Sequence, residues 1–273
     1  MPWGLIYLGV AFLVFGLLAR LTPCNPGQRR FLSRDLADNV LFWFLGALIY
    51  GDLAGGYLRA GAALATPHDA GAVVTALFAG YGWAARLPLL VQAVLILVVM
   101  DFIQYWLHRL FHVGALWPFH AVHHSAEDLD WTATYRIHPV NFAIYSAGAV
   151  ALTRLIGFQA AAFAIIGLFN LVIGALVHAN LDWTFGPFRY VIASPVYHRW
   201  HHARDPKAHN KNFAPTFPVW DLMFGTYHMP KGERPQSYGV EGVPTSFVAS
   251  LAYPFLELGR RMGLGRTRGE ATA

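Results

Sequence analysis

Closely spaced histidines are the residues of this sequence best suited to chemistry. The segment PFHAVHHSAED, residues 118–128, holds three histidines within five positions, and YHRWHH repeats the same His-x-x-His-His spacing. A third motif, HRLFH, places two histidines four residues apart, so on a helix they share one face. Neutral imidazole binds first-row metals such as iron, zinc and copper. The candidate metal ligands in these motifs are His108, His112, His120, His123, His124, His198, His201 and His202.

Two further histidines stand outside these clusters. His178, in VHANLD, is the ninth candidate ligand, and His138, in YRIHP, is expected either to bind the metal or to contact a ligand. One ion takes about four to six protein ligands, so nine histidines predict two metal ions rather than one. His68, His209 and His228 are isolated and are expected to be structural.

Two carboxylates are placed where they could support these ligands. On a continuous helix, positions 101, 105, 108 and 112 share a face, so Asp101 is predicted to accept the far N–H of a ligand imidazole. An ordinary aspartate at the end of a helix remains the alternative. Asp182 follows His178 by four residues and could orient or replace a ligand.

The composition is typical of a membrane protein. Of the 273 residues, 56% are hydrophobic and only 13% are charged, against about a quarter charged in soluble domains. The basic residues behind the formal net charge of +5 form no long tract, so we expect no nucleic-acid partner. The single cysteine, Cys24, excludes an internal disulfide.

Apolar runs long enough to cross a bilayer recur along the chain. The predicted spans are residues 3–19, 38–58, 87–107, 140–157 and 159–181, the last two forming a helical hairpin hinged near Gly157. The apolar patch at 70–84 is too interrupted to predict a span, and another patch at 244–256 is expected to lie on the membrane surface.

The basic residues predict the orientation of these spans. With the N-terminus outside, residues 20–37, 108–139 and 182–273 lie inside and hold 17 of the 20 Lys and Arg. This topology brings all the histidine motifs to the cytoplasmic face. We therefore predict an all-α fold: a polytopic membrane helical bundle with a cytoplasmic histidine-rich cap.

Six segments between about Asp101 and Tyr227 resemble a known family. They read DFIQYWLHRLFH, LWPFHAVHHS, YRIHP, HANLDW, SPVYHRWHH and NFAPTFPVWDLMFGTYH. Their order resembles that of the fatty acid hydroxylase and sterol desaturase superfamily, which are integral-membrane non-haem di-iron enzymes. The resemblance covers roughly half of the chain. It implies a di-iron catalytic domain at 87–235. The apolar runs on either side predict N-terminal membrane spans at 1–86 and a C-terminal interfacial segment and tail at 236–273.

The resemblance also implies which residues would hold two Fe ions. They are His108, His112, His120, His123, His124, His178, His198, His201 and His202. Some relatives carry a second histidine four positions after the one that matches His178. Here that position holds Asp182, with Asn180 nearby, so a carboxylate, an amide or water could replace one ligand. No His-Pro-Gly-Gly motif of a fused cytochrome b5-like segment occurs, so we expect a separate electron donor, cytochrome b5-like or ferredoxin-like.

The function implied is the O2-dependent hydroxylation or desaturation of a C–H bond in a membrane lipid, sterol-like or fatty acyl. One alternative is a histidine-rich membrane zinc protein, either a hydrolase or a metal transporter. A zinc protease of the HExxH type would need a motif that this sequence lacks. A second alternative is a haem-binding electron-transfer anchor, although two axial histidines would leave the repeated motifs unexplained.

Overall fold

The structure, a computed structural model, describes residues 2–28, 34–63 and 79–263, and helices make up nearly all of its regular structure. The long helices are α1 (Pro2–Leu21), α2 (Arg34–Ala63), α4 (Leu89–Phe111), α6 (Pro139–Ile156) and α7 (Ala160–His178). Within the described ranges no strand forms, and a single isolated β-bridge joins Ala203 to Tyr238. The predicted all-α class is confirmed.

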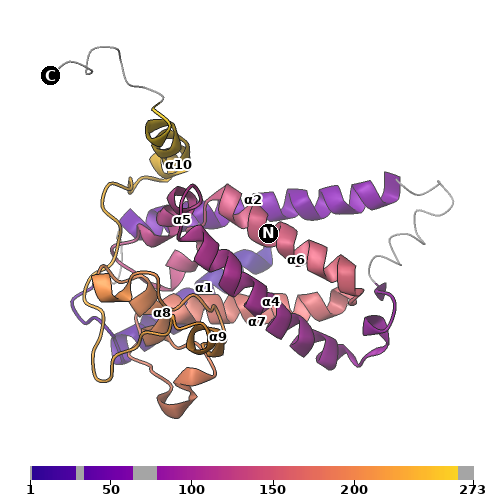
Figure 1. Cartoon of the computed structure of the whole chain (residues 1–273), viewed down its shortest axis with the longest axis horizontal. Coiled ribbons are helices and arrows are strands. Elements are labelled where there is room, and N and C mark those ends of the chain that lie inside the picture. Colours follow the sequence, from indigo (N-terminus) through magenta and orange to yellow (C-terminus); the bar gives the residue numbers. More distant parts are fainter. Residues whose placement is uncertain (1, 29–33, 64–78, 264–273) are drawn as a thin grey trace.

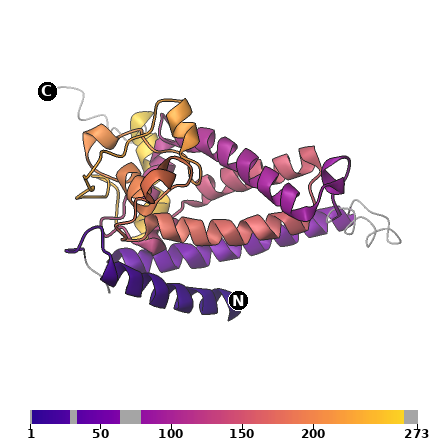
Figure 2. The ribbon, with the colours of Figure 1, turned by 90° about the horizontal axis from the view of Figure 1, so that it is seen from below.

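The long helices lie side by side as a bundle, and the short ones except η1 gather at one end of it (Figure 1). The short elements are η1 (Ala84–Arg86), α5 (Trp117–His124), η2 (Trp131–Tyr135), η3 (Gly186–Tyr190), α8 (Pro195–His201), η4 (Pro206–Ala208), α9 (Val219–Met223) and α10 (Phe247–Arg261). Figure 2 shows α1 along the outside of the bundle, where Ala11 and Phe15 pack with Ala175 and Trp131.

Three of the helices are long and apolar enough to cross a membrane: Gly4–Leu21, Leu89–Phe111 and Ala160–His178. They correspond to the predicted spans 3–19, 87–107 and 159–181. Predicted spans 38–58 and 140–157 fall within α2 and α6, while most of the patch at 70–84 lies outside the described residues. Large apolar side chains such as Leu13, Leu90 and Leu168 stay exposed, which is typical of helices that face lipid. The protein is an integral membrane protein.

Hydrogen bonds show that the histidine-bearing end of the bundle is built from segments far apart in sequence. The backbone N–H of Asn25, just after α1, donates to Oδ1 of Asn180, just after α7, at 2.9 Å. Asp35, at the start of α2, meets Arg136, just before α6. The ends of α1 and α7 therefore lie with the starts of α2 and α6, as the predicted topology requires.

The opposite end of the bundle has a tight turn between α6 and α7. Gly157 has φ of +85°, a value that favours glycine, and its carbonyl accepts the backbone N–H of Tyr81 at 2.8 Å. A Cβ atom on Gly157 would lie 2.4 Å from the carbonyl oxygen of Tyr81. The hinge of the hairpin is therefore where the sequence predicted it.

Arg136 is fully buried and ties α2 to the segment that precedes α6. Its guanidinium donates to Asp35 at 2.6 Å, to Oδ1 of Asn39 at 2.7 Å and to the hydroxyl of Ser125 at 3.0 Å. Asp35 also accepts the backbone N–H groups of residues 127 and 128. Because every donor and acceptor has a partner, this buried ion pair can fix the positions of both segments.

Replacing Arg136 by Met should destabilise the protein strongly, because it leaves the Asp35 carboxylate buried without its cation. We expect the free energy of unfolding to fall by about 3–5 kcal/mol. The measurement is the melting temperature in mild detergent.

Arg204→Met is the matched control, since Arg204 pairs with Glu127 at 2.8 Å on the surface, with 37% and 64% of the two side chains exposed. An exposed pair contributes about 0–1 kcal/mol, so this variant should melt near the parent. Equal losses in the two variants would contradict a special role for the buried pair.

Candidate metal centre

The candidate ligands are brought together because four helices present them at the same end of the bundle. His108 lies in the last turn of α4, His112 is the residue that follows it, and His178 is the last residue of α7. The two His-x-x-His-His motifs form the short helices α5 and α8, each with a proline in its first turn. Ser194 begins α8 by accepting the backbone N–H of Tyr197 at 3.2 Å.

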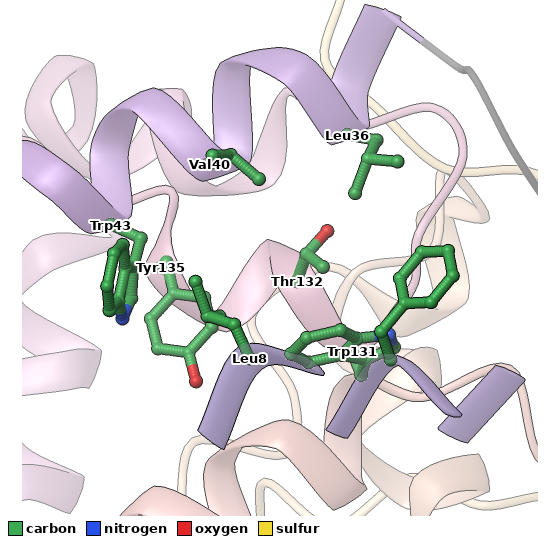
Figure 3. Close-up of a pocket in the computed structure, with 8 residues that line it drawn as sticks. Leu8, Leu36, Val40, Trp43, Trp131, Thr132 and Tyr135 are labelled. Carbon is green, nitrogen blue, oxygen red and sulfur yellow. The ribbon is translucent and has the colours of Figure 1, made fainter. Parts of the chain in front are cut away.

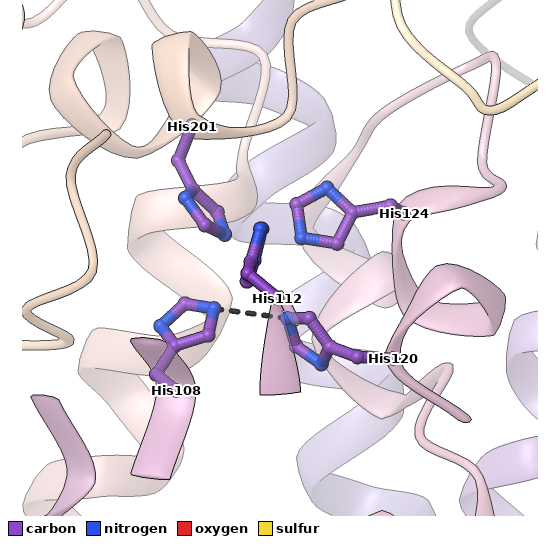
Figure 4. Close-up of side chains that lie close together, drawn as sticks. All are labelled: His108, His112, His120, His124 and His201. Atoms are coloured by element: carbon purple, nitrogen blue, oxygen red, sulfur yellow. Dashed lines mark hydrogen bonds between the residues drawn. The ribbon is translucent and has the colours of Figure 1, made fainter. Parts of the chain in front are cut away.

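The nine histidines fall into two groups, and within each group the ligand atoms lie within 4.8 Å of one another. The five-histidine group, shown in Figure 4, consists of His108, His112, His120, His124 and His201. The four-histidine group consists of His123, His178, His198 and His202. The helices α5 and α8 contribute to both groups, and the rings of His124 and His202 stack across them at 4.3 Å between centroids.

Backbone carbonyls determine which ring nitrogen carries the proton. Nδ1 of His108 lies 2.7 Å from the carbonyl oxygen of Phe213, and Nδ1 of His178 lies 2.7 Å from that of Gly174. A carbonyl can only accept, so in each neutral ring Nδ1 is the donor and Nε2 keeps its lone pair. The Nδ1 atoms of His123 and His201 meet the carbonyls of Arg136 and Lys211 in the same way, at 3.2 and 2.7 Å.

The Nε2 lone pairs therefore face one another. Nε2 of His123 lies 3.2 Å from Nε2 of His178, and both of these atoms are acceptors. Nε2 of His108 lies 2.9 Å from Nε2 of His120, whose Nδ1 faces the amide oxygen of Asn141 at 2.9 Å (Figure 4). Two lone pairs at such distances repel unless a cation lies between them.

A metal ion fits this arrangement better than a proton. Burial, reinforced by neighbouring histidines, holds the pKa of His120 and that of His123 well below the ordinary value, so neither ring gains a proton readily. Ring nitrogens bound at about 2.0–2.1 Å and at right angles around one ion would be about 3 Å apart. The observed separations of 2.9–3.2 Å match that value.

The remaining histidines of the five-histidine group support the same conclusion. Nε2 of His112, His124 and His201 is buried and has no hydrogen-bond partner among the described residues. Leaving a buried polar atom unpaired costs about 1–3 kcal/mol, so three at one site indicate a missing partner. The pKa of each of these three rings is well below its ordinary value, first because of burial, so all three remain neutral and able to bind a metal.

Asp101 lies next to the site but supports it differently from the prediction. Its two oxygens accept the backbone N–H groups of Thr216 and Phe217, at 2.8 and 3.0 Å, and the indole N–H of Trp220 at 2.9 Å. The expected contact with an imidazole is replaced by these three bonds. The buried carboxylate therefore fixes the turn before α9, because free backbone donors compete for it better than a histidine that already has a carbonyl partner.

The three other candidates outside the histidine motifs also lie outside the five-histidine and four-histidine groups. They are His138, Asn180 and Asp182. His138 bonds the carbonyl of Leu251 through Nε2, at 3.1 Å. Asn180 exchanges two hydrogen bonds with the backbone of Asn25, and Asp182 forms an exposed ion pair with Arg234. These contacts hold loops around the site. Of the isolated histidines, His209 is exposed, His228 packs its ring against Trp200, and His68 lies outside the described residues.

Asp221 is a supporting residue that the sequence analysis did not single out. Its carboxylate accepts the backbone N–H groups of Phe213 and Ala214 at 2.8 and 2.9 Å, the hydroxyl of Thr226 at 2.7 Å, and the hydroxyl of Tyr197. Phe213 is the residue whose carbonyl orients His108. Asp221 was visible only as part of the motif NFAPTFPVWDLMFGTYH, because nothing in its spacing connects it with a histidine.

Arg199, between the histidines of α8, is another residue without a signal in the sequence. It is fully buried and donates to the carbonyl of Leu129 at 2.7 Å, to the hydroxyl of Tyr238 at 3.0 Å and to the side-chain oxygen of Gln28 at 2.9 Å. A weaker bond of 3.3 Å reaches the carbonyl of His178. Arg199 therefore joins α8 to three other segments around the four-histidine group.

A small apolar cavity lies apart from the histidines, between α1, α2 and η2. Figure 3 shows several of the side chains around it, including Leu8, Val40, Trp43 and Trp131. Its volume is about 70 Å³, and its lining is apolar. No candidate ligand lines this cavity, so it does not form part of the metal site.

These features define a class of protein: a membrane helical bundle whose end holds a buried polyhistidine site suited to metal ions. Residues 93–226, nearly half of the chain, match the model of the fatty acid hydroxylase family. All nine candidate ligands lie within this segment. The chain belongs to this family, which confirms the membership predicted from the histidine motifs.

Several characterised proteins are similar to this chain. It is 35% identical to ornithine lipid hydroxylase OlsE of Rhizobium tropici over 186 residues, which cover 67% of this chain and 56% of that protein. It is 33% identical to alkylglycerol monooxygenase of Xenopus tropicalis over 140 residues, 50% of this chain and 30% of that one. C-4 methylsterol oxidase erg25 of Schizosaccharomyces pombe is 27% identical over 154 residues, 52% and 50% of the two chains.

The matched region spans about half of the hydroxylase and the methylsterol oxidase, and less than a third of the alkylglycerol monooxygenase. No solved structure matches this chain significantly.

Asp221→Asn should weaken metal binding. An amide in place of the carboxylate replaces one acceptor oxygen with a donor NH2 group that faces backbone N–H groups. The turn at Phe213 therefore loosens, and His108 loses the carbonyl partner that fixes its orientation. We expect metal affinity to fall by about 10–100-fold, measured by competition with a chelator in detergent.

Asp205→Asn is the matched control, since Asp205 accepts one backbone N–H in the short helix η4, away from the histidines. Tyr197→Phe removes only one of the four bonds to Asp221 and should have an intermediate effect. Unchanged metal affinity in Asp221→Asn would show that the turn does not position His108.

Proposed function

We propose that this protein is an O2-dependent oxidoreductase that hydroxylates a C–H bond of a membrane lipid at a histidine-bound di-iron centre. The observation that carries the proposal is the pair of buried histidine groups inside the fatty acid hydroxylase segment. Hydroxylation is favoured over desaturation because the similar proteins include an ornithine lipid hydroxylase and an alkylglycerol monooxygenase. The substrate class is a lipid with a fatty acyl, alkyl or sterol-like chain.

The two irons would be held by different numbers of imidazoles. The five-histidine group would hold one and the four-histidine group the other, so the second ion would have one protein ligand fewer. When bound, the irons would supply the activation of O2 for attack on an unactivated C–H bond. Every candidate ligand is a neutral side chain, which suits iron and other metals that bind imidazole.

The protein itself contributes orientation and the exclusion of water. The ring of Phe213 packs against His112 at 5.0 Å and against His201 at 5.9 Å between centroids, and Trp117 packs against His112 at 5.2 Å. These apolar walls would keep water from the ligand nitrogens. The carbonyl partners of Nδ1 hold the rings of His108 and His178 in the tautomer that a metal needs.

The site would face the cytoplasm and take its electrons from a separate protein, cytochrome b5-like or ferredoxin-like. The orientation is supported by the excess of Lys and Arg in the segments at the histidine-bearing end of the bundle. Labelling of a cysteine placed at Lys231 with a membrane-impermeant reagent, in intact and in opened cells, distinguishes the two orientations.

Iron content provides the first prediction for this function. Protein purified in mild detergent from iron-supplied cells should carry about two irons per chain, because two separate ligand groups are present. His120→Ala and His202→Ala each remove one ligand from a different group, so each should lose about half of the iron. The measurement is metal content by mass spectrometry.

His209→Ala is the matched control, since His209 is exposed and lies outside both groups. Stoichiometric zinc that persists with iron supplied would favour the hydrolase or transporter class. A haem absorption band would favour the electron-transfer anchor. Either result would contradict the di-iron proposal.

Oxygen incorporation provides the second prediction. Iron-loaded protein in liposomes of bacterial lipid extract, given 18O2 and a chemical reductant, should produce a lipid with one oxygen atom taken from O2, because hydroxylation inserts that atom into a C–H bond. The measurement is lipid mass spectrometry, with His120→Ala as the control. An alkene without added oxygen would show desaturation. A product whose added oxygen atom is unlabelled, and therefore came from water, would refute an oxygenase.

A further inference from the structure

The helix α10, Phe247–Arg261, has an apolar face that the rest of the protein leaves uncovered. At 100° per residue, Val248 and Phe255 lie on one face and Leu256 lies beside it. Their side chains are 75%, 57% and 59% exposed. A helix of a water-soluble domain normally turns its apolar face toward the core, so this arrangement indicates another apolar partner.

The face that α10 turns toward the protein holds its two buried residues, Ser250 and Pro254. The hydroxyl of Ser250 donates to the carbonyl of Pro244 at 2.9 Å. This face packs against α5 and the beginning of α2. The orientation of the helix is therefore set by contacts with the protein, and these contacts leave the apolar side chains outward.

The start of α10 adjoins α2, the helix that contains the predicted span 38–58. The backbone N–H of Phe247 donates to Asp38 of α2 at 3.0 Å, and its ring meets the buried ring of Phe42 at 4.9 Å. Leu41, next to Phe42, and Leu48, six residues beyond Phe42 along α2, are 46% and 58% exposed. The start of α10 therefore packs on a helix that itself exposes large apolar side chains. Figure 1 shows α10 beside α5, at the end of the bundle that holds the histidines.

We propose that α10 lies in the interfacial layer of the bilayer, with Val248, Phe255 and Leu256 inserted among the lipid chains on the side of the membrane that carries the histidine site. Amphipathic helices of this kind bury their apolar face at the boundary between headgroups and acyl chains. The last turn carries Arg260 and Arg261, both exposed, against one acidic residue, Glu257. This excess of positive charge suits the phosphates of lipid headgroups.

Contacts with the protein connect this helix to the metal site. Phe255, which is 57% exposed, also meets the ring of Phe119 of α5 edge-on at 5.5 Å. The carbonyl of Leu251 accepts the N–H of His138 at 3.1 Å. Because α5 carries three candidate ligands, a membrane-bound α10 would fix the depth of those ligands relative to the lipid chains. This role does not depend on which reaction the site performs.

The test uses single cysteines at Val248 and at Leu256, each labelled with an environment-sensitive fluorophore after the full protein has been reconstituted in liposomes. The native Cys24 is buried. Parent protein treated with the same fluorophore measures any background labelling of Cys24. A cysteine at Lys231, exposed in a loop outside α10, is the control. Nitroxide-bearing lipid should quench the two α10 labels at least about twofold more than the control, and aqueous iodide should show the reverse order.

Two results would overturn the proposal. Iodide quenching at Val248 and Leu256 equal to that at Lys231 would place this face in water. Protection from both quenchers would show that protein covers it, for example a second copy of the chain. Both substituted side chains are exposed, so the variants should fold, and each position tests the proposal independently.

Discussion

The arrangement of the whole histidine-bearing end depends on one interaction, the repulsion between imidazole lone pairs that lie close to one another. His123 and His178 face each other through Nε2 at 3.2 Å, while their Nδ1 protons are committed to carbonyls. Without a cation this contact is repulsive, and burial removes the water that would relieve it. The fold therefore brings these lone pairs together where a metal ion would bind both of them, so metal binding should contribute to the stability of the folded chain.

Histidines and carboxylates have separate roles in this structure. The described residues of both ligand groups are all histidines, whereas the buried carboxylates Asp101 and Asp221 accept backbone N–H groups of the turn that leads to α9. That turn supplies the carbonyl that orients His108, 105 residues away in sequence. The carboxylates thus act on the site through the backbone. Their negative charges are satisfied by hydrogen bonds, and the metal is left with neutral imidazole rings as ligands.

The sequence predicted which histidines would come together, but not which of them would belong to each of the two ligand groups. The spacing of three and four residues places the histidines of each His-x-x-His-His motif on one helical face. The number of groups was predicted from the count of nine histidines, which is too many for one ion. Neither the spacing nor the count can show that His120 and His124 join His201 while His123 joins His198, because that depends on how α5 and α8 face each other. Asp101 illustrates the same limit: its helical position was predicted, but its partners come from a turn 115 residues later.

The spans were predictable for a different reason, since a bilayer demands long apolar helices whatever surrounds them. The sequence also predicted that the apolar patch at 244–256 lies on the membrane surface, but it could not show which contacts orient α10. The buried contacts of Ser250 and Pro254, and the bond from Phe247 to Asp38, turn its apolar side outward. A pattern of hydrophobicity indicates which face of a helix needs an apolar partner. Only the contacts around the helix decide whether that partner is protein or lipid.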